Sequence, residues 1–140
     1  MIRKAETGRT KDAGWQVGVS RTLDHPVQRV WDMLTSPAGT DLWLGHGVRL
    51  AEEPGGPYET DEGVRGETRS FRAHDRIRLT WQPEDWDHET TVQLAVSRVD
   101  ATRTRLRFHQ ERMTSSVERE QQRRHWRAVL DSITAALDTD

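Results

Sequence analysis

Apolar and polar residues alternate with a period of two in several parts of this chain. In the clearest case, Ile77, Leu79 and Trp81 alternate with arginine and threonine. Such alternation predicts a strand with one buried face. Similar segments are expected from Trp15 to Leu23 and over residues 63–74, 92–96 and 103–109. Because short turns join the last four of these strands, the pattern predicts an antiparallel meander.

A helical period appears in two other regions. The segment "PVQRVWDML", residues 26–34, predicts a short amphipathic helix with Asp24 as its N-cap and Pro26 in its first turn. A second short helix should begin at Ser36–Pro37 and end at Gly45. These two pieces follow the first strand directly and precede the meander.

The C-terminal part predicts one long helix over residues 117–137. Ser115 and Glu118 form a capping-box pattern at its start. Its apolar positions fall at i, i+4, i+7 and i+11, and they are Trp126, Leu130, Ile133 and Leu137. Residues 118–125 are polar on all sides, so we expect this first half to extend beyond the packed stripe.

The order of these elements predicts an α+β fold. The sheet must cover its apolar face, and only the C-terminal helix is long enough for that task. The sheet should therefore curl around this helix, and a gap should remain where a curved sheet diverges from a straight helix. The expected organisation is a flexible N-terminus over residues 1–12 followed by a single domain over residues 13–140.

Composition narrows the possible classes of protein. The 140 residues carry a formal net charge of -2, which gives no bulk attraction to nucleic acid or anionic membranes. Cysteine is absent, so disulfides, thiolate nucleophiles and cysteine-based metal sites are excluded. With no apolar run of membrane-spanning length and no signal-peptide pattern, we expect a cytoplasmic protein without membrane insertion.

Four stretches of the chain resemble one known family. They are "PVQRVWDMLTSP…LWLG", "GGPYETDEGVRGETRSFRAHDRIRLTWQ", "TTVQLAVSRVDATRTRLRFHQERM" and "HWRAVLDSITAALD". They resemble the SRPBCC superfamily (START-like and Bet v-like, with a helix-grip fold) over residues 15–138. Within it, they are most similar to small bacterial proteins of the branch named for activators of heat-shock protein 90 ATPase. The resemblance implies a deep pocket for hydrophobic small molecules. Family members often carry glycine where this chain has His125, which would narrow or polarise the cavity.

The six tryptophans allow two interpretations. They could fill a core that is poor in leucine and isoleucine, or they could present flat surfaces to a ligand. Trp43 and Trp86 lie at element ends or in a bend, where a rim or gate role is favoured. The predicted ligand contacts are large apolar or aromatic side chains expected to line the cavity: Trp31, Leu34, Trp43, Tyr58, Phe71, Trp81, Trp86, Phe108, Trp126 and Leu130. Tyr58, His125 and Arg127 are candidates for orienting a ligand.

Other chemistry is less well supported by the sequence. Residues 84–89, "EDWDHE", gather acids and His88, but no histidine pair at helical spacing supports a metal site, and a solvated turn is favoured. No triad or paired-carboxylate pattern nominates a catalytic residue, and no cofactor is expected. An arginine stripe should face solvent, where it could dock an acidic partner or nucleic acid, although a solvated sheet face is favoured; it comprises Arg76, Arg78, Arg103, Arg105 and Arg107.

The favoured hypothesis is therefore a domain that binds a lipid-, aromatic- or polyketide-like small molecule between the sheet and the C-terminal helix. One alternative is a protein-interaction module similar to the chaperone-activator branch. The other is an enzyme similar to polyketide cyclases or hydrolases. A homodimer or a protein partner stays open, and no nucleic-acid partner is expected.

Overall fold

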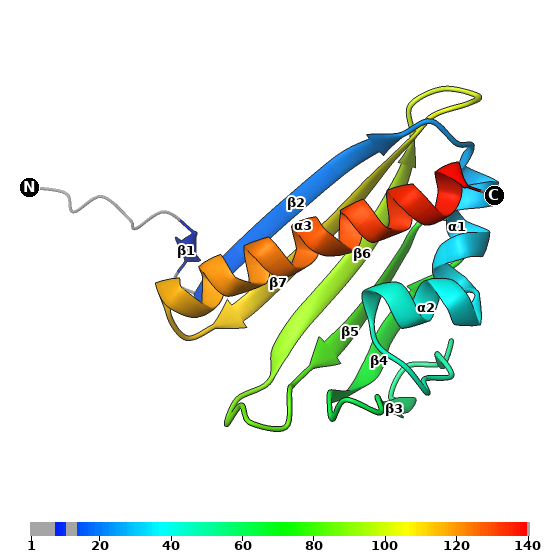
Figure 1. Cartoon of the computed structure of the whole chain (residues 1–140). Coiled ribbons are helices and arrows are strands. Elements are labelled where there is room, and N and C mark those ends of the chain that lie inside the picture. The colour runs from blue at the N-terminus through cyan, green and yellow to red at the C-terminus, as the bar shows by residue number, and fades with distance from the viewer. Residues whose placement is uncertain (1–7, 11–13, 140) are drawn as a thin grey trace, which may run out of the picture.

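The structure is a computed structural model, and it describes residues 8–10 and 14–139. One antiparallel sheet and three helices make up these residues (Figure 1). In chain order the elements are β1 (Arg9–Thr10), β2 (Gly14–Leu23), α1 (Val27–Thr35), α2 (Pro37–Trp43), β3 (Pro57–Glu59), β4 (Arg65–Arg72), β5 (Arg76–Trp81), β6 (Thr90–Arg98), β7 (Thr104–Met113) and α3 (Ser116–Asp138).

The predicted helix-grip fold is confirmed. Strands β4 to β7 form the expected meander, β3 adds to its edge beside β4, and β2 pairs with β7, which gives the order β1-β2-β7-β6-β5-β4-β3. Helix α3 lies along one face of the sheet, while α1 and α2 cover the end of that face nearest the C-terminus (Figure 1). Of the N-terminal segment predicted to be flexible, residues 1–7 and 11–12 lie outside the described residues. Arg9–Thr10 pairs with the start of β2.

The core lies between the sheet and α3. Alternate residues of each central strand point toward the helix, and Ile77, Leu94 and Leu106 are fully buried there. On α3, Val129 is buried beside the side chains predicted from the helical period, which are buried as well: Trp126, Leu130, Ile133 and Leu137. The two periodicities of the sequence therefore meet in one hydrophobic core.

The starts of the helices match the predictions in part. The hydroxyl of Ser115 accepts a hydrogen bond of 3.1 Å from the backbone N–H of Glu118, as the capping box predicts. The carboxylate of Glu118 accepts from the backbone N–H of Thr114. The prediction that Asp24 caps α1 is wrong, because the N-cap residue is Pro26 and no side chain caps this helix.

The first half of α3 is also packed more closely than predicted. Gln122 is 7% exposed, and the side chain of Glu118 is 14% exposed. These residues are buried because β7 and the β5–β6 loop supply polar partners for them. The expectation that residues 118–125 extend beyond the packed part of the helix is therefore wrong for Glu118 and Gln122, whereas Gln121, Arg124 and His125 are exposed.

Candidate ligand site

A continuous run of aromatic rings fills the space between the sheet and α3. Trp126 stacks on Phe108 with ring centroids 4.8 Å apart, and Phe108 contacts Trp43 at 6.3 Å. In the other direction, Trp126 contacts Trp81 at 6.4 Å, and Trp81 meets Trp86 edge-on at 5.3 Å. Five of the residues predicted to contact a ligand are thus brought together in one chain of ring contacts.

Two more of the predicted contacts form a separate aromatic group. Trp31 on α1 meets Phe71 on β4 edge-on, with centroids 5.7 Å apart, and His74 lies 5.8 Å from Trp31. Together with Leu50 these rings line a hollow of about 390 Å³. This group is beside α1 and the β4–β5 turn, and no ring contact joins it to Trp86 or Trp126 among the described residues.

The last three predicted contacts are dispersed. Leu34 and Leu130 are buried in the core, and the backbone carbonyl of Leu34 accepts a 2.8 Å hydrogen bond from Nε1 of Trp43. Tyr58 donates its hydroxyl to the carbonyl of Thr80 and lines a different hollow, of about 680 Å³, with Gly66 and Glu89. Burial and the nearby Glu89 carboxylate raise the pKa of Tyr58, so the phenol stays protonated.

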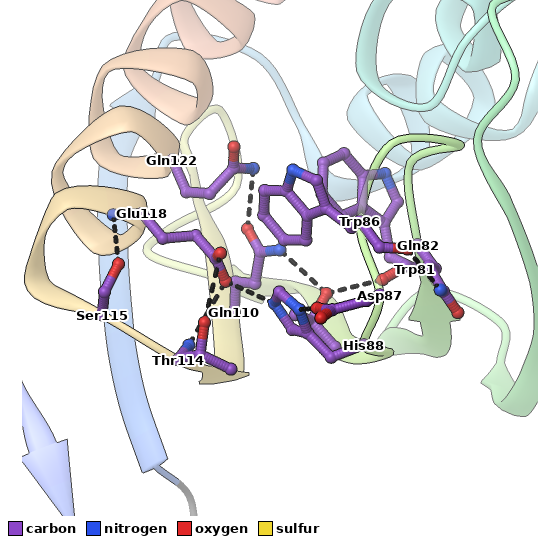
Figure 2. A network of polar contacts seen from close by, with 11 residues as sticks. Trp81, Gln82, Trp86, Asp87, His88, Gln110, Thr114, Ser115, Glu118 and Gln122 are labelled. Carbon is purple, nitrogen blue, oxygen red and sulfur yellow. Dashed lines mark hydrogen bonds and ion pairs between the residues drawn. The ribbon is translucent and has the colours of Figure 1, made fainter.

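A buried polar network adjoins the aromatic run (Figure 2). Oε1 of Gln110 accepts hydrogen bonds from Nε1 of Trp126 (2.8 Å) and Nε2 of Gln122 (3.0 Å). The amide of Gln110 donates to the hydroxyl of Thr90, which donates to the carbonyl of Trp81. Since each buried polar group has a partner, the network fixes the orientation of these rings rather than weakening the core.

The β5–β6 loop closes over this end of the core, and Trp86 is its central side chain. The Trp86 ring is half-buried and stacks on His88 with centroids 5.0 Å apart. His88 in turn bridges the carboxylates of Asp87 (3.0 Å) and Glu118 on α3 (2.7 Å), as Figure 2 shows. Partial burial lowers the pKa of His88, but the hydrogen bonds to the two carboxylates outweigh that effect and raise it.

His125 lies beside the same rings. Its imidazole is 4.6 Å from the Trp126 ring and 6.3 Å from the Trp81 ring. His125 is exposed to solvent on its outer side, and desolvation on the side of the rings lowers its pKa. Of the three candidates for orienting a ligand, only His125 contacts the aromatic run; Tyr58 and Arg127 line other hollows.

Sequence reasoning missed the polar part of this site, although the pattern contains its signal. Gln110 follows Leu106 and Phe108 on the buried side of β7, where another apolar residue would be expected. Gln122 lies four residues before Trp126 and continues the buried stripe of α3. A polar residue at a position that the strand or helix pattern marks as buried needs a hydrogen-bond partner. Here the side-chain amides of Gln110 and Gln122 are partners of each other.

The described residues give little support to other kinds of site. Among residues 8–10 and 14–139, no group of three or more histidines and acids is placed to hold a metal ion. Residues 84, 85 and 87 are exposed, as a solvated turn predicts, but His88 is anchored to α3. None of the described helices combines the length and the apolar character that a membrane crossing requires.

These features define a helix-grip domain with an aromatic interior and a loop that covers one end of it. The family model described as activator of Hsp90 ATPase homolog 1-like protein matches residues 24–138, so the chain belongs to this family. No curated protein matches the chain.

Solved structures show the same fold. DynU16, a protein in the dynemicin biosynthetic locus, has 22% identity and a TM-score of 0.78; the match covers 89% of this chain but 47% of DynU16. CalU16 from Micromonospora echinospora has 21% identity and a TM-score of 0.75, with 92% of this chain and 80% of that chain covered. PFC0360w, an HSP90 activator from Plasmodium falciparum, has 19% identity and a TM-score of 0.63, with 74% and 76% covered.

Proposed function

We propose that the chain binds an apolar, ring-containing small molecule where the β5–β6 loop meets α3. We call this place the aromatic mouth, and it consists of Trp81, Trp86, His125 and Trp126. The observation that carries the proposal is the position of Trp86, a half-buried indole on a loop that covers the buried Trp81. A ligand that takes the place of this ring gains a ready-made aromatic wall.

Trp86 is suited to act as a gate. Its backbone is held by hydrogen bonds to Pro83 and Gln82, whereas its ring contacts two other rings, Trp81 and His88. Within the described part of the chain, no hydrogen bond involves its indole N–H. Moving the ring outward therefore breaks its aromatic contacts. Each such pair contributes about 0.5–1.5 kcal/mol in addition to the effect of buried area.

The mouth also has the groups that a selective site needs. Apolar ligand surface removed from water contributes roughly 25 cal/mol per Å². The imidazole of His125, whose pKa is lowered by desolvation, supplies one polar group that can form a hydrogen bond with a ligand hydroxyl. The ligand contacts predicted deeper in the molecule or outside the mouth stay predictions; they are Trp31, Leu34, Trp43, Tyr58, Phe71, Phe108 and Leu130.

The test is a calorimetric titration with 2-naphthol, a two-ring probe with one hydroxyl. Because the wild-type protein must first displace Trp86, W86A should bind the probe more tightly, by about 2- to 12-fold for each of the two ring contacts that displacement breaks. The control is W15F, which changes a tryptophan located under Arg9 at the start of β2. Equal affinity of W86A and wild type, or no binding to either, would contradict the proposal.

Both alternatives can be distinguished from it. A cyclase- or hydrolase-like enzyme needs a titratable group against its substrate, and His125 is the group in the mouth. That alternative predicts conversion of a polyketide-like compound by the wild type and its loss in H125Q. A protein-interaction module would instead use a surface away from the mouth. The outer face of the sheet, opposite α3, is one such surface, because arginines lie next to one another there.

A further inference from the structure

The outer face of the sheet, opposite α3, contains a row of cross-strand neighbours with three arginines. Arg72 on β4 pairs with Arg76 on β5, and Arg76 pairs with Ala95 on β6. Ala95 pairs with Arg107 on β7, and Arg107 pairs with Ser20 on β2. We call Arg72, Arg76 and Arg107 the arginine row. Only small side chains, Ala95 and Ser20, separate or flank these arginines.

This arrangement is unfavourable in the isolated chain. Arg72 and Arg76 are directly opposite each other, and like charges at such positions repel. Nε of Arg76 is buried and has no hydrogen-bond partner. A buried donor without a partner carries a desolvation penalty that water cannot repay. The repulsion between Arg72 and Arg76 would be relieved by an anion on this face.

Neighbouring acids do not neutralise the row. Glu111 pairs with Arg78 at 2.5 Å, and Glu67 pairs with Arg69 at 2.8 Å. Within the part of the chain that the structure describes, Arg72, Arg76 and Arg107 make no ion pair with any acid. The face therefore retains a concentrated positive charge, although the whole chain has a formal net charge of -2.

The geometry leaves room for an anion between two of the arginines. Strands in a sheet lie about 4.8 Å apart, so the backbones of Arg76 and Arg107 are about 10 Å apart across β6. The guanidinium of Arg107 lies over Gly18, where a Cβ atom would be 3.3 Å from its Nη2. It thus leans toward β2, and the methyl group of Ala95 forms the floor between the two arginines.

We propose that the arginine row docks an acidic polypeptide segment, with a carboxylate above Ala95 that is bound by Arg76 and by Arg107 once its guanidinium turns back from Gly18. Guanidinium groups suit this task, because they bind carboxylates through paired hydrogen bonds. Nucleic acid fits less well: no tryptophan, phenylalanine or tyrosine stands in the row to stack on bases, and the net charge is slightly negative. The sequence alone favours a solvated face; the register, which places Arg72, Arg76 and Arg107 in one cross-strand row, favours a docking surface.

The test measures anisotropy of a fluorescein-labelled peptide of alternating glutamate and serine at low ionic strength. R76Q/R107Q should weaken binding at least about tenfold, as expected for two charge-assisted contacts. R123Q/R124Q is the matched control, because it removes the same charge from α3, where both arginines are near Glu120. This control should bind as wild type does. Thermal unfolding confirms that each variant is folded.

A second variant tests the same position by adding a carboxylate to the protein itself. A95E puts a carboxylate between Arg76 and Arg107, so it should abolish peptide binding without lowering the melting temperature. Three results would overturn the proposal. They are absence of peptide binding to the wild type, equal weakening by both double variants, and binding of a thymidine oligonucleotide of equal charge at least as tightly as the peptide. Because Trp86 is on a separate loop, W86A should leave peptide affinity unchanged, which separates this test from that of the aromatic mouth.

Discussion

Nε1 of Trp126 donates a 2.8 Å hydrogen bond to Oε1 of Gln110, and both residues are fully buried between α3 and the sheet. The tryptophan is thereby fixed in one orientation, with one face against Phe108. Because Oε1 of Gln110 also accepts from Gln122, one amide oxygen serves two donors of the same helix. This oxygen thus links α3 to β7 at two points.

Replacement of Gln110 by leucine should therefore be costly. Q110L leaves the Trp126 indole N–H and the Gln122 amide without an acceptor, and each unsatisfied buried group costs about 1–3 kcal/mol. We expect a loss of about 2–6 kcal/mol in the free energy of unfolding, measured by urea denaturation. S97A, at an exposed position of β6, is the control and should change it by less than about 0.5 kcal/mol. A near-neutral Q110L would contradict the role of the network.

The second prediction concerns Gly66, where the backbone of β4 lies close to that of β5. A Cβ atom there would be 2.0 Å from the carbonyl oxygen of Thr80, so G66A must push β4 away from β5. We expect a destabilisation of about 3 kcal/mol or failure to fold, seen in thermal unfolding. In G18A the nearest atom is 3.3 Å away and belongs to the flexible Arg107 side chain, so this control should be nearly neutral. Similar losses in both variants would refute the argument.

The third prediction concerns the N-termini of α3 and α1, of which only that of α3 is capped by a side chain. S115A removes the hydroxyl that accepts from the N–H of Glu118, and it should cost about 1 kcal/mol. D24A should have little effect, because Asp24 does not cap α1. Urea denaturation of the two variants tests this directly. If D24A lost more free energy of unfolding than S115A, Asp24 would cap α1 after all, as the sequence suggests.

The contact between His88 and Glu118 predicts a pH dependence. A histidine with a raised pKa stabilises the fold fully below its unfolded pKa of about 6.5, and this stabilisation is lost as pH rises through the folded pKa. His109 and His125, whose pKa values are lowered by burial, act in the opposite direction. The comparison is therefore between wild type and H88Q: their difference in free energy of unfolding, up to about 1 kcal/mol near pH 5.5, should shrink by pH 8.5. A difference that grows with pH would be inconsistent with this contact.

Much of the fold is contained in the two periodicities of the sequence. The alternation around Leu79 and the stripe from Trp126 to Leu137 predict the strands and the long helix, because burial of one face dominates their energetics. The cap at α1 was not predictable in the same way. Asp24 is a favoured capping residue, but the chain enters α1 through Pro26, whose backbone conformation decides the start.

The candidate site was predicted only in its apolar part. A tryptophan in a periodic position can be recognised as buried, so Trp81 and Trp126 were found from the sequence. Which rings touch depends on sheet curvature and register, and these separate Trp31 and Phe71 from the aromatic mouth. The bridge from His88 to Glu118 joins residues 30 positions apart, a distance over which local pattern carries no information.

The central claim, that the aromatic mouth receives a ligand, is tested most directly by the indole N–H signals of the six tryptophans in a ¹H–¹⁵N NMR titration with 2-naphthol. We expect the signals of Trp81, Trp86 and Trp126 to shift in proportion to binding, while the signal of Trp15 stays in place. If those three signals do not move at saturating probe, or if only the Trp31 signal moves, the mouth is not the binding site.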